Sequence, residues 1–209
     1  MPVNATNDKL GWLAPTFTLM DVSENYISLD QLKGENGTVI AFICNHCPYV
    51  IAIAERLSFE AKELKKLSIN TIAIMSNDVN QYPEDSFDNM KLFSKKYDFN
   101  FHYLYDETQE VAQNYGAVCT PDIFGFNKSL ELMYRGRIDS GVMNSNNSEI
   151  KRELYLAMNK IKNDGVGPKE QLNSFGCSIK WKNDCIECVY ELAIYRQMSV
   201  QLGKRQFRY

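Results

Sequence analysis

Two cysteines and a histidine lie close together in the order Cys44-Asn-His46-Cys47, and a proline follows at position 48. Because Pro is favoured at the first position of a helix, Pro48 places Cys47 at the cap of a helix that begins there. Free backbone N–H groups and the positive end of the helix dipole would then face the Cys47 sulfur. Both favour the thiolate and lower the pKa of Cys47 from its usual value of about 8.5. A protonated His46 would add to this effect, so the stretch predicts thiol chemistry centred on Cys47.

The residues around this stretch predict a buried strand that leads into an amphipathic helix. Residues 38–44 form a continuous apolar run rich in β-branched side chains, as in a strand covered on both faces. After Pro48, apolar residues recur at helical spacing. Open α/β sheets carry their functional sites at the carboxyl ends of strands, so the position of Cys44 and Cys47 itself favours a site.

The rest of the chain predicts an α/β fold, with a central mixed sheet and helices on both of its faces. The expected strands span 69–75, 101–105, 122–126 and 130–138, the last two as a hairpin, and the expected helices span 87–97, 108–115 and 150–161. Residues 168–181 predict no regular element, and a further helix is expected after them.

Composition excludes several classes of function. The 209 residues are 44% hydrophobic, which is enough for a substantial core. With 26 acidic and 23 basic residues, the chain gives no electrostatic reason to expect nucleic acid or an anionic membrane as a partner. No apolar stretch is long enough to span a membrane, and the first residues lack the order of a secretory signal. We therefore expect a cytoplasmic protein whose six cysteines are redox-active, metal-binding or buried thiols.

Several motifs together resemble the thioredoxin superfamily. Residues 14–21, Ala-Pro-Thr-Phe-Thr-Leu-Met-Asp, and residues 27–34 are similar to the N-terminal hairpin of the redoxin family, that of alkyl hydroperoxide reductase and thiol-specific antioxidant proteins. Thr120-Pro121 resembles the cis-proline loop of the superfamily. The segments 45–50, Asn-His-Cys-Pro-Tyr-Val, and 176–181, Gly-Cys-Ser-Ile-Lys-Trp, resemble an uncharacterised peroxiredoxin-like branch.

This resemblance covers roughly residues 13–181, so we expect a thioredoxin-like domain over residues 1–181, and the apolar spacing after it predicts a helical extension over residues 182–209. The resemblance also implies that the Thr120–Pro121 peptide bond is cis, faces Cys47 and offers the Thr120 backbone to an extended peptide substrate. No cofactor or metal is implied. The expected partners are protein or small-molecule disulfides and thiols, and the oligomeric state stays open.

Two assignments of the attacking cysteine remain open. Counting from Phe42 places Cys47 at the attacking position of a thioredoxin, and Val50 where a thioredoxin carries its resolving cysteine and a peroxiredoxin its peroxidatic cysteine. Alternatively, Cys44 attacks and Cys47 resolves, as a Cys-x-x-Cys pair. The helix N-terminus favours Cys47 as the attacking thiolate, with Cys44 as the resolving thiol.

The residues before Cys47 depart from the peroxiredoxin signature Pro-x-x-x-Thr-x-x-Cys. Cys44 stands at the Thr position and Ile40 at the Pro position. The sequence therefore favours a thiol–disulfide oxidoreductase over a thiol peroxidase. A third hypothesis is a redox-inactive module, or a copper-binding one that uses Cys44, His46 and Cys47 as soft ligands. His102 is then the only candidate for a distant histidine ligand.

The other cysteines lie outside this stretch. Cys119 precedes Thr120-Pro121 and is either a second redox partner for Cys47 or a small core residue. Cys177 has no assignable chemistry from the sequence alone. Cys185-Ile-Glu-Cys188 could join Cys177 in a zinc site, but no histidine follows to supply a fourth ligand. A reversible disulfide or two ordinary thiols is the favoured interpretation of that pair.

Overall fold

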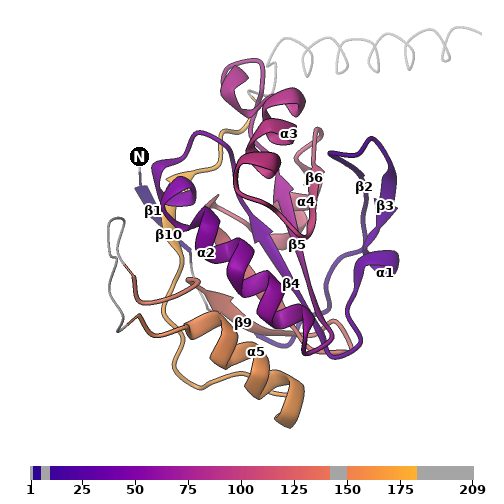
Figure 1. Ribbon diagram of the computed structural model, residues 1–209, viewed down its shortest axis with the longest axis vertical. Coiled ribbons are helices and arrows are strands. Elements are labelled where there is room, and N and C mark those ends of the chain that lie inside the picture. The colour runs from indigo at the N-terminus through magenta and orange to yellow at the C-terminus, as the bar shows by residue number, and fades with distance from the viewer. Residues whose placement is uncertain (1, 6–9, 142–149, 183–209) are drawn as a thin grey trace, which may run out of the picture.

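The computed structural model describes residues 2–5, 10–141 and 150–182, and its central element is a seven-stranded mixed sheet (Figure 1). Its strands are β2 (Thr18–Asp21), β3 (Tyr26–Ser28), β4 (Gly37–Phe42), β5 (Ile69–Met75), β6 (His102–Tyr105), β8 (Asp122–Phe126) and β9 (Leu132–Gly136). Their order in the sheet is β3-β2-β6-β5-β4-β8-β9. Strands β4, β5 and β6 are parallel, and the flanking strands pair antiparallel. This is the thioredoxin-like fold that the sequence predicts.

A second, smaller sheet joins three distant parts of the chain. Its strands are β1 (Pro2–Asn4), β10 (Phe175–Ser178) and β7 (Cys119–Thr120). They pair antiparallel in the order β1-β10-β7, so β10 lies between the N-terminus of the chain and the segment that precedes β8.

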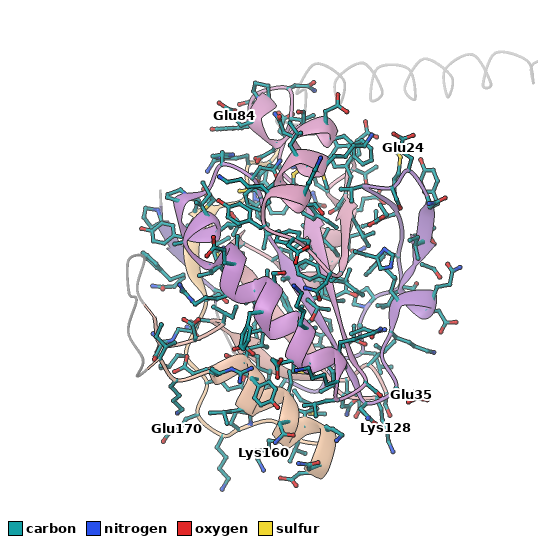
Figure 2. All side chains as sticks on the ribbon, viewed as in Figure 1. Glu24, Glu35, Glu84, Lys128, Lys160 and Glu170 are labelled. Atoms are coloured by element: carbon teal, nitrogen blue, oxygen red, sulfur yellow. The ribbon has the colours of Figure 1, made fainter. Side chains whose placement is uncertain are left out.

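Helices cover both faces of the large sheet (Figure 1). They are α1 (Leu29–Leu32), α2 (Pro48–Lys65), α3 (Phe87–Lys96), α4 (Glu110–Tyr115) and α5 (Glu153–Asp164), with a 3₁₀ turn, η1 (Pro83–Asp85), before α3. Helices α2, α3 and α5 pack on one face, and α1, α4 and the segment that leads into β2 pack on the other. Figure 2 labels charged side chains on the outside of this framework, namely Glu24, Glu35, Glu84, Lys128, Lys160 and Glu170.

Strand β4 is the centre of both cores. All of its residues are buried. Because successive side chains of a strand point to opposite faces, Val39 and Ala41 contact the α2 side, whereas Ile40 and Phe42 contact the α4 side. The continuous apolar run in the sequence is therefore needed to fill two cores at once.

The sequence predicted the elements with strong local patterns, and the structure confirms them within a few residues: the strands at β4, β5 and β6, the helices at α2 to α5, and the hairpin β8–β9. The prediction of an irregular segment over 168–181 is wrong at β10. The segment Phe-Gly-Cys-Ser is short and contains a glycine, which is depleted in strands, and the strand forms because β1 and β7 pair with it on both sides.

The helical extension expected from residue 182 onward falls on residues 183–209, outside the described part of the chain. Within the described residues, no helix combines the length and the apolar character that a membrane crossing requires.

Candidate active site

Cys47 lies at the N-terminal end of α2, where β4 has ended. Its backbone is extended, with φ −67° and ψ 122°, and Pro48 begins the helix. The Cys47 carbonyl accepts the helical hydrogen bond from the Ile51 N–H, at 2.9 Å. Cys47 is therefore the cap residue, as the sequence predicts, and its side chain, like that of Cys44, has no exposed surface.

The groups that most favour the Cys47 thiolate through hydrogen bonding are the thiol of Cys44, the thiol and backbone N–H of Cys177, and the backbone N–H of Val50. The bond from Cys44 has the largest effect, and together the donors overcome the opposing effect of burial and lower the pKa of Cys47 to about 5. When Cys47 is protonated, its thiol lies 3.2 Å from the Thr120 carbonyl oxygen and donates to it.

The thiol of Cys44 is a weaker acid than an ordinary cysteine thiol. Its Sγ lies 3.3 Å from the Thr120 hydroxyl. The hydrogen bond that Cys44 donates to Cys47 raises the pKa of Cys44 well above its usual value, and burial and the charge of Asp85 raise it further. At neutral pH the two sulfurs therefore form a pair of one thiolate, at Cys47, and one thiol, at Cys44.

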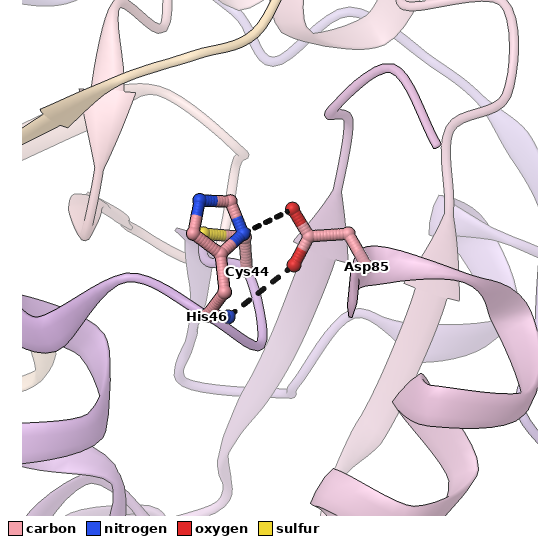
Figure 3. A group of neighbouring side chains, drawn as sticks. All are labelled: Cys44, His46 and Asp85. Atoms are coloured by element: carbon pink, nitrogen blue, oxygen red, sulfur yellow. Dashed lines mark hydrogen bonds and ion pairs between the residues drawn. The ribbon is translucent and has the colours of Figure 1, made fainter. Parts of the chain in front are cut away.

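His46 is held by a buried carboxylate from η1 (Figure 3). Its Nδ1 lies 2.8 Å from Asp85 Oδ2, and its ring stacks on Tyr82 with the centroids 5.5 Å apart. The hydrogen bond to Asp85 raises the pKa of His46 despite the opposing effect of burial, and the charge of the Cys47 thiolate contributes in the same direction. The positively charged form of His46 and the Cys47 thiolate therefore stabilise each other.

Asp85 also fixes the loop that carries the cysteines. Its Oδ1 accepts hydrogen bonds from the backbone N–H groups of Asn45, at 2.8 Å, and His46, at 3.3 Å. Its Oδ2 accepts a further one from the Asn77 side-chain amide, at 2.7 Å. No sequence pattern pointed to Asp85 or Asn77, because both lie in a polar loop, and only a contact across 39 residues brings Asp85 to His46.

The Thr120–Pro121 peptide bond is cis, as the sequence led us to expect. The Thr120 carbonyl oxygen lies 3.2 Å from the Cys47 Sγ, so this loop faces the thiol. The backbone of Thr120, however, is already paired: Thr120 lies opposite Cys177 in the β7–β10 ladder. A segment of the chain itself thus occupies the position that we expected an extended peptide to take.

Comparisons with known proteins identify the family of the chain. Residues 10–138 match the model of the AhpC/TSA family. The chain belongs to the AhpC/TSA family. With its thioredoxin-like fold, this membership identifies a redox protein of the thioredoxin type.

Two solved structures resemble this AhpC/TSA protein over most of its length. An uncharacterised conserved protein from Geobacillus kaustophilus is 40% identical, with a TM-score of 0.83 over 88% of this chain and 98% of that one. A hypothetical protein from Sinorhizobium meliloti is 32% identical, with a TM-score of 0.81 over 86% of this chain and 98% of that one. The comparison with curated proteins gave no match.

A more distant structure shares the fold alone. A secreted disulfide oxidoreductase of Mycobacterium tuberculosis, homologous to DsbE of Escherichia coli, is 20% identical, with a TM-score of 0.51 over 68% of this chain and 94% of that one.

Cys119 of this AhpC/TSA protein is a neutral, buried thiol. Its Sγ lies 3.6 Å from the Pro121 carbonyl oxygen, and burial raises its pKa. It is not among the groups that donate to Cys47. The pair Cys185 and Cys188, with the proposed zinc or disulfide role, lies outside the described residues.

One group of side chains could hold a metal ion. Among the described residues, Cys44, His46 and Asp85 bring ligand atoms within 4.8 Å of one another. Both oxygens of Asp85 already accept two hydrogen bonds each, so an ion would have to displace some of them. His102 lies at the opposite end of the parallel strands, at the start of β6, where its Nδ1 is 3.3 Å from Asp21. The geometry therefore does not bring His102 to the copper site considered from the sequence.

We expect Cys47 to titrate near pH 5 in the reduced protein and to be the most acidic of the four described thiols. Cys44→Ala removes the strongest hydrogen bond to Cys47 and should raise that pKa. Cys119→Ala is the matched control, because this thiol is also buried but does not donate to Cys47, and it should leave the pKa unchanged. Ultraviolet thiolate absorbance, with Cys47→Ser as the blank, measures each value. A transition near pH 5 that survives in Cys47→Ser would contradict the assignment.

Asp85→Asn should lower the pKa of His46 toward its ordinary value, because the carboxylate is the main cause of the rise. The charge of the exposed Glu84 also raises the pKa of His46, but by less. Glu84→Gln is therefore the control and should lower the pKa of His46 less than Asp85→Asn does. Titration of the imidazole signals by NMR gives both values. Equal effects of the two substitutions would show that Asp85 is not the residue that holds the proton on His46.

Proposed function

We propose that this AhpC/TSA protein is a thiol–disulfide oxidoreductase in which Cys47 is the attacking thiolate and Cys44 the resolving thiol. The observation that carries the proposal is the unequal acidity of two adjacent sulfurs. Cys47, at the N-terminus of α2, has a pKa of about 5, whereas Cys44 retains its proton and donates it toward Cys47. A thiolate next to a thiol is the arrangement that a two-step disulfide exchange requires.

The exchange proceeds in two balanced steps. The Cys47 thiolate attacks one sulfur of a substrate disulfide, which forms a mixed disulfide and releases the first half of the substrate as a thiolate. The Cys44 thiol then attacks the Cys47 sulfur, and the second half leaves with the proton from Cys44. Two electrons pass from the cysteine pair to the substrate. Because hydrogen bonds stabilise the Cys47 thiolate, they stabilise the reduced cysteine pair, make the Cys44–Cys47 disulfide easier to reduce, and shift the equilibrium toward the reverse direction, in which the protein oxidises thiols.

Access to Cys47 restricts the substrate. Both sulfurs are fully buried, and the Thr120 backbone is paired with β10. A disulfide held in the surface of a folded protein has no direct route to Cys47 in this conformation. We therefore propose low-molecular-weight disulfides and thiols as the first partners to test, and the cytoplasm, which the sequence predicts, as the compartment.

Cys47→Ser should reduce the rate of small-disulfide reduction to that of the uncatalysed exchange, since no thiolate of comparable acidity remains among the described residues. Cys44→Ser, combined with Cys177→Ser so that no neighbouring thiol resolves the adduct, should retain the first step and accumulate a mixed disulfide on Cys47. Intact-mass spectrometry after mixing with glutathione disulfide measures the adduct. If Cys44→Ser loses the first step and Cys47→Ser retains it, the roles of the two cysteines are reversed.

A thiol peroxidase is the second candidate, and the burial of Cys47 favours it, because hydrogen peroxide is smaller than any disulfide and enters a buried site more easily. The positions of the peroxiredoxin Thr and Pro, however, are occupied by Cys44 and Ile40. The Thr120 hydroxyl contacts Cys44 rather than Cys47. The thiolate thus lacks the hydroxyl that would position peroxide.

We expect oxidation of Cys47 by hydrogen peroxide to be slow and proportional to peroxide concentration, without saturation. Stopped-flow fluorescence, followed by trapping of the sulfenic acid, measures the rate. Rapid and saturable oxidation would place the peroxidase first and the disulfide exchange second.

A further inference from the structure

The segment that follows α5 returns across the active site and is held on both sides of β10. Before the strand, the buried Ser174 hydroxyl donates to the Gly136 carbonyl at 2.6 Å. After it, the Lys180 N–H donates to the Asn77 side chain at 2.8 Å, and the Lys180 carbonyl accepts from the Gln109 side chain at 2.8 Å. Between these anchors, β10 pairs with β1, beside which it lies in Figure 1, and on its other edge with β7. These contacts, at both ends of β10 and along both of its edges, fix the strand beside Cys47.

A glycine permits the close approach of β10 to the cis-proline loop. A Cβ added to Gly176 would overlap the Thr120 carbonyl oxygen and lie 3.0 Å from Pro121 Cδ. Gly in a strand often marks such a close backbone approach. Any larger residue would move β10 away from Thr120.

Cys177, the next residue, lies where a substrate cysteine would lie. Its backbone pairs with Thr120 in an antiparallel register, which is how an extended peptide adds to an exposed strand. The Thr120 carbonyl oxygen is 3.2 Å from the Cys47 Sγ, and Cys177, opposite Thr120 in the ladder, packs against the core cluster that contains Cys47. This position agrees with the part that Cys177 has in lowering the pKa of Cys47.

Cys177 also differs from the other described thiols in its exposure. Cys44, Cys47 and Cys119 have no exposed surface, whereas Cys177 is only partly buried. Of these four thiols, Cys177 is thus the one that both contacts Cys47 and meets the solvent.

We propose that Cys177 is the redox partner of Cys47 on the exposed side of the site, and that it transfers electrons between the buried sulfurs and thiols in solution. The proposal rests on the proposed function in that it takes Cys47 as the attacking thiolate. It adds a second resolving thiol, which acts from β10, whereas Cys44 acts from within the core.

Each step balances. After Cys47 has formed a mixed disulfide with a small disulfide R–S–S–R, the Cys177 thiol attacks the Cys47 sulfur, and R–S⁻ leaves with the proton of Cys177. The product is a Cys47–Cys177 disulfide. A thiolate from solution then attacks the accessible sulfur of Cys177, and Cys47 leaves as a thiolate, the better leaving group because of its low pKa. A second thiol from solution releases Cys177 and takes the oxidised partner away as a disulfide.

Disulfide mapping of the full-length protein tests the proposal. Reduced protein is mixed with one equivalent of glutathione disulfide, quenched with acid and an alkylating reagent, digested, and analysed by mass spectrometry. We expect a Cys47–Cys177 cross-link in the natural sequence and in Cys44→Ser, and none in Cys177→Ser, which should instead hold glutathione on Cys47 longer. Cys119→Ala is the matched control and should leave the cross-link unchanged.

Gly176→Ala tests the geometry without removing a thiol. Because the added methyl group moves β10 from Thr120, the Cys47–Cys177 disulfide should form roughly tenfold more slowly or worse, which corresponds to about 1.4 kcal/mol on the barrier. Glutathionylation of Cys47 should persist in this variant.

The outcomes separate this inference from the proposed function. If Cys47 takes up no glutathione in any variant, the proposed function itself is wrong. If Cys47 reacts but only the Cys44–Cys47 disulfide forms, at the same rate with and without Cys177, the role of Cys177 is wrong and the proposed function stands. A Cys177 found only in a disulfide with Cys185 or Cys188 would also overturn the inference.

Discussion

The structure of the site depends on keeping a negatively charged sulfur in a place without solvent. Burial of an ionised group is costly unless hydrogen bonds replace those of water. At Cys47, the N-terminus of α2 and hydrogen-bond donors make that replacement, and the main donors come from three places in the chain: Cys44 before the helix, Val50 in its first turn, and Cys177 on β10. The thiolate is therefore stable only when the loop after β4 and the β10 segment are both in position.

A single chain of hydrogen bonds connects the loop after β4 to the β10 segment. Asp85 accepts from the backbone of the cysteine loop and from the Asn77 amide, and the Asn77 carbonyl oxygen accepts from the backbone of Lys180, just after β10. Asp85 is fully buried, and its charge faces His46, whose pKa it raises. The same buried carboxylate thus positions the loop that carries the sulfurs and favours the positively charged form of His46 beside the thiolate.

Sequence reasoning found the part of the site whose information is local. Pro48 after an apolar run is enough to place Cys47 at a helix cap, and β4, α2 and β5 carry periodic patterns that no tertiary contact needs to complete. The missed part is specified by distant contacts. In the sequence, Asp85 is typical of a loop residue, and only the fold brings it to His46. Gly176 is likewise typical of a turn, and only the fold places its backbone against the Thr120 carbonyl. A four-residue strand that contains a glycine has no sequence pattern strong enough to predict it, so β10 and the position of Cys177 could not be predicted.

The hydrogen bonds from Cys177 link the position of β10 to the ionisation of Cys47. Interactions that lower the pKa of Cys47 are, by reciprocity, interactions that the thiolate strengthens and the thiol weakens. The folded-state pKa of about 5 lies below the usual value for cysteine. The contribution of these interactions to the stability of the folded protein is therefore fully present above the usual pKa of cysteine and is lost as the pH falls through about 5. Oxidation of Cys47 removes the negative charge in the same way as protonation does. The interaction of Cys177 with Cys47 is therefore strongest when Cys47 is a thiolate and weakest when the sulfur is protonated or oxidised.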